Sequence, residues 1–190
     1  MKKKIPSYEE FDSFYGGDYK LDYVAQETIS NFESIGKWLY LGADILDGGF
    51  AKVGMTMGDL ASRSYSSTRP SYYLFCAFKF KHNISMQDVK RVENDVLLRL
   101  DRLHCNDDGS SKRMIHYESG KPSECFYPVD FFSFYKDLHW EIYDGHRNSF
   151  VICGYKNKYG MDDGEFVDCI FNDQQEGRHD EYRKMILQHD

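Results

Sequence analysis

Two short apolar runs on either side of a glycine turn constrain the fold of this chain most. Residues 38–41 read Trp-Leu-Tyr-Leu, residues 47–49 read Asp-Gly-Gly, and residues 50–54 read Phe-Ala-Lys-Val-Gly. Apolar runs separated by such a turn signal are typical of a β-hairpin. The pairing of its strands would bring Tyr40 and Lys52 close together.

A helix is predicted to begin directly after this hairpin. Thr56 suits the helix start, because its hydroxyl can accept a hydrogen bond from a first-turn amide. Asp59, three residues later, suits the positive end of the helix dipole. Arg63 would then lie on this helix, one turn beyond Leu60.

A second helix is predicted over residues 85–103, with Ser85 as its N-cap and Asp88 in its first turn. Its buried stripe is predicted from apolar residues at three- and four-residue spacing: Val89, Val92, Val96, Leu100 and Leu103. Glu93 falls on the same face. Burying an ionised carboxylate costs several kcal/mol unless a cation, a metal or several donors compensate. The ordinary alternative is a glutamate at the edge of the core, paired with a nearby Lys or Arg.

Together these residues resemble the GIY-YIG nuclease superfamily. Residues 38–40 stand at the place of the first motif, and residues 52–56 are similar to the second motif in its K-I-G-x-T variant. Arg63 and Glu93 take the places of the family's helix arginine and metal-binding glutamate. Residues 124–126, Glu-Cys-Phe, are similar to the E-W-F signature of the phage-associated branch.

The sequence also departs from the family pattern. Trp38 replaces the glycine of the first motif, and Lys52 replaces the first tyrosine of the second, as in some family members. Tyr40 is therefore the only motif tyrosine. The resemblance covers residues 36–126, about half of the chain, and it implies a phage, mobile-element or restriction setting.

The resemblance and the remaining patterns predict an α+β protein in three parts. Residues 1–35 form an N-terminal helical extension, with a helix over 22–35. Residues 36–128 form a GIY-YIG-like nuclease module, a small antiparallel three-stranded sheet flanked by helices, with residues 72–80 as its central strand. Residues 129–190 form an appendage with a β-meander and a helix. Its elements are a short helix at 128–137, strands at 138–143, 150–155 and 166–171, and a closing helix at 173–188.

The implied activity is metal-dependent endonuclease hydrolysis of a DNA phosphodiester. Glu93 would bind Mg²⁺ or Mn²⁺, which in proteins is commonly held by one or two carboxylates and several waters. Arg63 would bind the scissile phosphate through its planar fork. Tyr40 would act as the general base. Since a free phenol has a pKa near 10, its anion needs a nearby cation, and Lys52 is placed to supply it.

The charge distribution is compatible with a DNA partner only in the middle of the chain. The net charge is −7, but residues 36–128 carry slightly more basic than acidic side chains, and both flanks are acidic. The candidate phosphate contacts are Arg69, Lys79, Lys112, Arg113 and Lys121. The alternative is an ordinary mixed surface.

Two other functions remain open at this stage. A catalytically silent module with the same fold would bind nucleic acid or a protein, and the acidic flanks would favour a basic partner. A restriction-type or homing-type enzyme would use the C-terminal meander to recognise sequence. A homodimer would allow two cuts in a duplex, but no helix shows a dimer seam.

Composition indicates a cytoplasmic protein without a membrane span. No run approaches 18 apolar residues, and the lysine-rich N-terminus lacks an apolar signal core. The five cysteines contain no C-x-x-C pair, which favours reduced thiols. A zinc site from His104, Cys105, His116 and Cys125 would fit no standard spacing.

Overall fold

A computed structural model describes residues 24, 26–31, 36–58, 60 and 70–189. The chain divides into two compact units, residues 1–35 and residues 36–190. In the first unit, residue 24 and residues 26–31 are helical, within the predicted N-terminal helix. The remainder of that helix lies outside the described residues.

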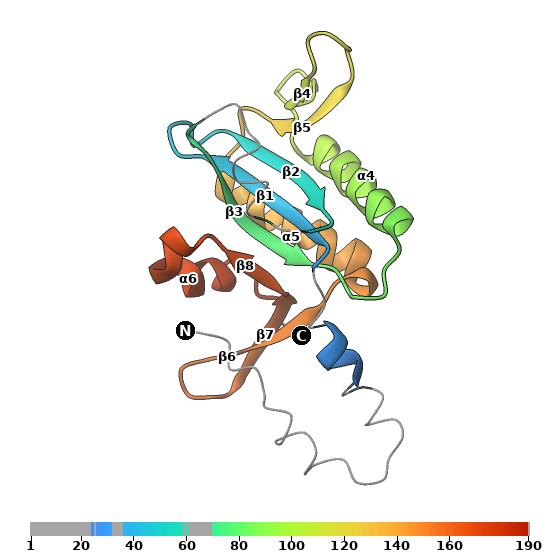
Figure 1. Ribbon diagram of the computed structural model, residues 1–190. Helices are drawn as coiled ribbons and strands as arrows, with labels where there is room; N and C mark the ends of the chain where they lie inside the picture. The colour runs from blue at the N-terminus through green and yellow to red at the C-terminus, as the bar shows by residue number, and fades with distance from the viewer. Residues whose placement is uncertain (1–23, 25, 32–35, 59, 61–69, 190) are drawn as a thin grey trace. The chain divides into compact units, whose positions relative to one another are not determined.

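The second unit is built on a six-stranded antiparallel sheet (Figure 1). The prediction of an α+β fold is confirmed, but the prediction of a small three-stranded sheet is wrong. The strands run in the order β4-β5-β2-β1-β3-β8, so β1 and β2 occupy the centre and β3 is an interior strand beside them. Their bounds are β1 Trp38–Asp44, β2 Ala51–Thr56, β3 Tyr72–Lys79, β4 Arg113–Ile115, β5 Pro122–Phe126 and β8 Cys169–Phe171.

The predicted hairpin is confirmed as β1 and β2. Their register runs from Trp38 opposite Thr56 to Ala43 opposite Ala51. At the turn, the Asp47 carboxylate accepts a hydrogen bond from the Gly49 amide at 3.2 Å. Thr56 is the last residue of β2 and is buried, and the helix predicted after it, including Asp59 and Arg63, lies largely outside the described residues.

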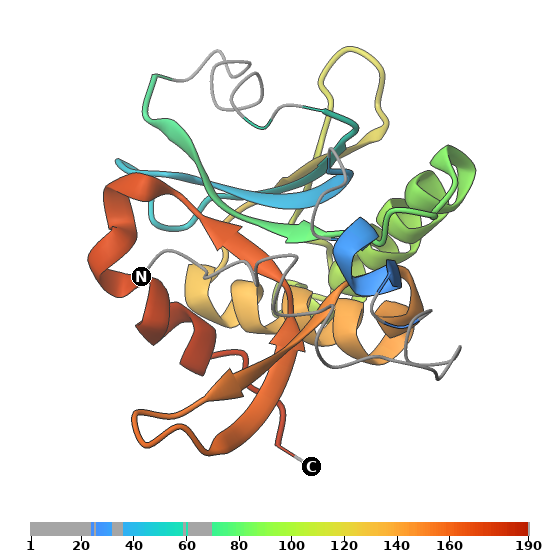
Figure 2. The same cartoon turned by 60° about the horizontal axis from the view of Figure 1, so that its bottom comes forward.

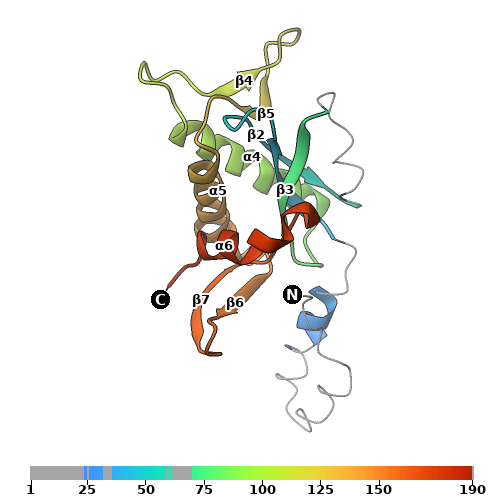
Figure 3. The same ribbon diagram turned by 90° about the vertical axis from the view of Figure 1, so that its left-hand side faces the viewer.

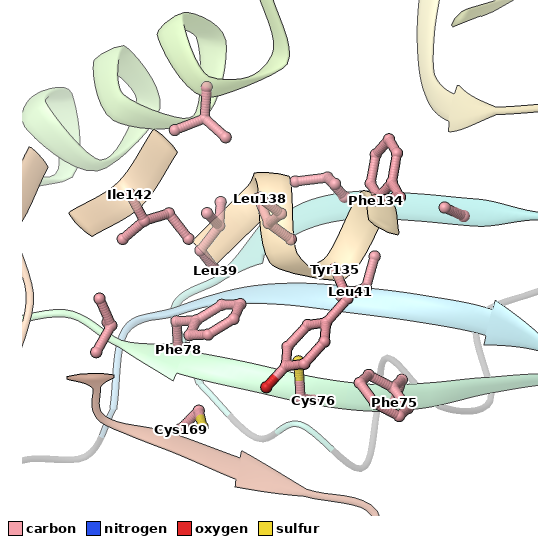
Figure 4. Packing of buried hydrophobic residues seen from close by; sticks show 14 of the residues in the cluster. Leu39, Leu41, Phe75, Cys76, Phe78, Phe134, Tyr135, Leu138, Ile142 and Cys169 are labelled. Atoms are coloured by element: carbon pink, nitrogen blue, oxygen red, sulfur yellow. The ribbon is translucent and has the colours of Figure 1, made fainter. Parts of the chain in front are cut away.

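Two helices, α4 (Met86–Leu103) and α5 (Phe131–His146), pack against one face of this sheet. Figure 4 shows Leu39 and Leu41 of β1 and Phe78 of β3 directed toward Leu138 and Ile142 of α5. These side chains are fully buried. Burial of apolar area on this scale is the main driving force for folding, so this face of the sheet forms the core.

The start of α4 agrees with the prediction, because the Ser85 hydroxyl accepts a hydrogen bond from the Asp88 amide at 3.1 Å. The buried stripe differs at its C-terminal end. Leu97 is buried, whereas Leu103 is 55% exposed. The last turn of α4 therefore extends past the core.

Two sequence predictions are wrong over the residues of α5. The predicted short helix at 128–137 and the predicted strand at 138–143 are one helix, which Asp130 caps by accepting a hydrogen bond from the Ser133 amide at 2.7 Å. Its buried residues recur at helical spacing: Phe134, Tyr135, Leu138, His139 and Ile142.

The C-terminal third contributes to the core and does not form the predicted appendage. A 3₁₀ turn, η1 (Arg147–Ser149), leads into β6 (Ile152–Lys156), which pairs with β7 (Asp162–Val167) as a separate hairpin, seen below the main sheet in Figure 2. β8 then pairs with β3 in the main sheet. The closing segment is η2 (Asp173–Arg178) followed by the short helix α6 (His179–Lys184). The three-stranded meander is therefore wrong, and residues 36–190 form one compact unit, with no division at residue 128.

Candidate functional site

The face of the sheet that bears Tyr40 lies opposite the helical core. Successive side chains of a strand point to opposite faces, and Leu39 and Leu41 both belong to the core beneath α4 and α5. Tyr40 belongs instead to a second small cluster with Leu74 and Ala77, packed against Trp38 and Leu60. The ring of Tyr40 is 3% exposed, so packing fixes its direction.

Gly54 lies directly opposite Tyr40 in the hairpin. A Cβ atom at Gly54 would lie 2.5 Å from the Tyr40 hydroxyl oxygen and 3.2 Å from Oε2 of Glu124. Both oxygens therefore lie over the bare backbone of Gly54. A side chain at this position would occupy their place.

Lys52 lies on β2, the strand that also carries Gly54. Its partners in the sheet are Gly42 on β1 and Cys125 on β5. Its ammonium Nζ lies 3.7 Å from Oε2 of Glu124, and both side chains are partly exposed. The predicted proximity of Tyr40 and Lys52 thus takes the form of a shared sheet face, with the Glu124 carboxylate beside each of them.

Glu124 is the site residue that was not predicted from the sequence. It belongs to the segment that is similar to the E-W-F signature, so a signal was present. The pairing of β5 with β2 at Ala51 and Lys52 brings this carboxylate to the hairpin.

Glu93 lies on α4, which contacts β2. Val89 and Leu97, one helical turn away on either side, are both buried, and Glu93 itself is half-buried. This agrees with the predicted inward direction of its carboxylate. The structure thus places Tyr40, Lys52 and Glu124 on one face of the sheet. Glu93 lies on α4, which packs against the opposite face, so the structure does not bring its carboxylate together with the other three side chains. Arg63 lies outside the described residues.

The predicted phosphate contacts fall into three groups. Lys79 is 6% exposed, and its ammonium lies 5.7 Å from the centre of the Trp38 ring, so it is a buried cation on the Tyr40 face and not a surface contact. Lys112, Arg113 and Lys121 lie on or beside the hairpin of β4 and β5. Arg69 lies outside the described residues.

The donors near the hairpin suit a hard cation in kind but are few. Within the described residues, no group of three or more His, Cys, Asp or Glu side chains is placed to hold a metal ion. Mg²⁺ needs fewer, because it retains several waters and is commonly bound through one or two carboxylates together with a substrate phosphate. Glu93 is a partly buried carboxylate of this kind.

Comparisons with protein-family models, with curated proteins and with solved structures gave no match. No helix in the described part of the chain has both the length and the apolar character needed to cross a membrane. The function must therefore be inferred from the side chains on this hairpin and beside it.

Gly54→Ala is expected to destabilise the fold by about 1–3 kcal/mol, since an added methyl group would overlap the packed Tyr40 ring. The measurement is the free energy of unfolding in urea. Gly154→Ala is the matched control: Gly154 is also a strand glycine, but a Cβ there meets no atom within 4 Å. Equal effects of the two substitutions would contradict the close approach of Tyr40 to Gly54.

Proposed function

We propose that this protein is a metal-dependent endonuclease that hydrolyses DNA phosphodiester bonds through a GIY-YIG-type site. The observation that carries the proposal is the position of the Tyr40 hydroxyl and the Glu124 carboxylate, which both lie over Gly54, with the Lys52 ammonium beside that carboxylate. A phenol, an amine and a carboxylate at one strand pair exceed what packing of a sheet face requires. Glu93 on α4 supplies a further carboxylate, from the helix that packs against the opposite face of the sheet.

Tyr40 is the proposed general base, which accepts a proton from the attacking water. Its ring is held by Leu74 and Ala77, so the hydroxyl has a fixed position. The phenolate that this role requires is disfavoured by the Glu124 carboxylate, and Lys52 on the same face is the proposed cation that offsets this charge and favours the ionised form. Glu124 balances the charge of Lys52 when no phosphate is bound, and a phosphate that enters the site gives the ammonium a second anion to contact.

The proposed metal ligand is Glu93, with Mg²⁺ or Mn²⁺ as the ion. Such an ion would stabilise negative charge on the phosphate and on the leaving oxygen. The half-buried position of Glu93 reduces its contact with solvent, which strengthens its attraction for a cation. Arg63 is the proposed phosphate-binding residue, as the family resemblance implies.

Metal dependence tests this proposal. Supercoiled plasmid and single-stranded DNA are incubated with the wild-type chain in Mg²⁺, in Mn²⁺ and in EDTA, and nicked products are separated on a gel. We expect cleavage in either metal, none in EDTA, and loss of the metal-dependent activity in Glu93→Gln. Glu176→Gln, which neutralises an exposed glutamate on η2, is the matched control and should cleave like wild type.

Absence of cleavage by the wild-type chain in both metals would contradict the endonuclease proposal. The acidic flanks and the small number of metal donors would then favour the second candidate, a catalytically silent module that binds nucleic acid or a protein. Salt dependence separates its two forms, since phosphate-dominated binding weakens steeply as salt rises.

A further inference from the structure

A projecting hairpin continues from the candidate site. We define the arm as residues 112–126, which comprise β4, the turn at residues 116–121 and β5. Among the residues that the structure describes, the arm joins the rest of the sheet through the pairing of β5 with Ala51 and Lys52 of β2, and β4 is an edge strand. Figure 3 shows the arm extending away from the body of the sheet.

The arm exposes side chains that are usually buried. Met114 is 43% exposed, Ile115 is 56% exposed, and Tyr117 at the turn is 101% exposed. Within the described residues, Tyr117 makes no hydrogen bond, ion pair or ring contact. Its ring therefore contributes nothing to the packing of the described fold and is available to a ligand.

The arm is also locally basic in an acidic protein. Lys112, Arg113 and Lys121 accompany two acidic residues, Glu118 and Glu124, so the arm carries a net charge of +1, whereas the whole chain carries a net charge of −7. The Nε atom of Arg113 donates a hydrogen bond to the Ser123 carbonyl at 2.6 Å, which holds the base of the guanidinium along the hairpin. Cations next to an exposed ring complement the phosphates and bases of a nucleic acid strand.

We propose that the arm binds the DNA strand that leaves the candidate site, with its cations on phosphates and Tyr117 stacked on an unpaired base. This inference rests on the proposed function and narrows its substrate to DNA with a single-stranded segment. Glu124 of the site and Tyr117 of the tip belong to the same hairpin. At about 3.3 Å per residue, the tip lies roughly 10–15 Å along β5 from Glu124, a distance of a few nucleotides along a strand.

An unpaired base fits the tip better than a base pair. Every base offers a flat face, and stacking on an aromatic side chain contributes about 1–3 kcal/mol per base in single-strand complexes. In a duplex, each base already stacks on its neighbours, so contact with Tyr117 would require partial unstacking. The tyrosine therefore selects a strand whose bases are open.

Fluorescence anisotropy of labelled oligonucleotides tests the role of Tyr117. The full-length chain is titrated, in EDTA, into a single strand and into a blunt duplex of the same sequence and length. Tyr117→Ala is expected to weaken single-strand binding by about 5- to 100-fold and to leave duplex binding within about twofold, while Tyr117→Phe retains near wild-type affinity. Tyr159→Ala is the matched control, because Tyr159 is an exposed tyrosine beside a lysine, Lys158, in another turn.

The salt dependence of single-strand binding tests whether the cations of the arm contact phosphates. For single-strand binding, the slope of log K against log salt concentration changes by about 0.7 for each phosphate contact. Lys112→Ala combined with Lys121→Ala is therefore expected to reduce the slope by about 1.4, whereas Lys158→Ala leaves it unchanged. An unchanged slope in the double variant would remove the phosphate contacts from the proposal.

The arm proposal is overturned if the wild-type chain does not bind the single strand, if Tyr117→Ala binds it like wild type, or if Tyr117→Ala weakens duplex binding equally. These outcomes are independent of cleavage, because EDTA suppresses metal chemistry. Loss of single-strand binding in Tyr117→Ala together with no cleavage by the wild-type chain in Mg²⁺ or in Mn²⁺ would support the arm proposal and overturn the endonuclease proposal. Metal-dependent cleavage by the wild-type chain, with unaltered single-strand binding in Tyr117→Ala, would support the endonuclease proposal and overturn the arm proposal.

Discussion

Tyr40→Phe is expected to lower the rate of DNA cleavage by about 10²- to 10⁴-fold, the usual contribution of a general base. The substitution removes only the hydroxyl, which lies beside Glu124 over Gly54, and leaves the ring packed against Leu74 and Ala77. The fold should therefore persist. The measurement is the single-turnover rate of plasmid nicking in saturating Mg²⁺, with circular dichroism to verify folding.

Tyr159→Phe provides the control for Tyr40→Phe. It removes the hydroxyl of a tyrosine that is 72% exposed, in the turn between β6 and β7, and should nick at the wild-type rate. A folded Tyr40→Phe variant that nicks as fast as Tyr159→Phe would exclude Tyr40 as the base. Glu124, whose carboxylate lies beside the same position, would then be the next group to examine.

The second large effect concerns a buried histidine in α5. His139 is fully buried, and its Nε2 accepts a hydrogen bond from the Val167 amide at 3.0 Å. Because Nε2 is the acceptor, the ring hydrogen is on Nδ1, which has no hydrogen-bond partner within the described residues. Burial lowers the pKa of the His139 imidazole to about 3.

Acid is therefore expected to destabilise the fold through His139. Below a pH of about 6.5 the unfolded chain binds a proton on this ring, whereas the native chain binds one only near pH 3, so stability falls as pH decreases between these values. The loss is about 1.4 kcal/mol per pH unit, or roughly 2 kcal/mol between pH 7 and pH 5. Urea unfolding at a series of pH values measures it.

His139→Gln isolates this effect from the carboxylates that also titrate in acid. Glutamine can accept the hydrogen bond from the Val167 amide but does not ionise. The difference in unfolding free energy between wild type and His139→Gln should therefore change with pH by the amount expected for one histidine. A difference that stays constant from pH 7 to pH 5 would show that the ring titrates alike in both states.

Local sequence signals were sufficient for the hairpin and for α4. The turn at residues 47–49 and the apolar runs beside it determine β1 and β2, and Ser85 determines where α4 begins. These elements depend on neighbours in the sequence. Their turn and capping preferences operate before any tertiary contact forms.

The sequence pattern predicts a strand in the C-terminal half of α5 because of Trp140. Leu138, Trp140 and Ile142 alternate with polar residues, as in a half-buried strand. In the helix, Trp140 is 47% exposed while Leu138 and Ile142 are fully buried. Because Trp140 is apolar but exposed, apolar and polar residues alternate in this part of the sequence as they would in a strand, although the segment is a helix.

Long-range pairing explains the rest of the errors. Nothing near Cys169 or Pro122 in the sequence indicates that β8 pairs with β3 or that β5 pairs with β2. The six-stranded sheet therefore could not be predicted from local patterns. For the same reason the sequence predicts the proximity of Tyr40 and Lys52, which belong to one hairpin, but not that of Glu124, which reaches them through a distant strand.

The place of β8 in the sheet also affects how the chain is made. Its partner β3 ends at Lys79, whereas β8 begins at Cys169. On the ribosome, the edge of β3 that pairs with β8 must therefore wait for the whole intervening segment to be synthesised. Such a high contact order is associated with slow folding, and an unpaired sheet edge is prone to aggregation. Chains that terminate before residue 169 would retain that open edge permanently.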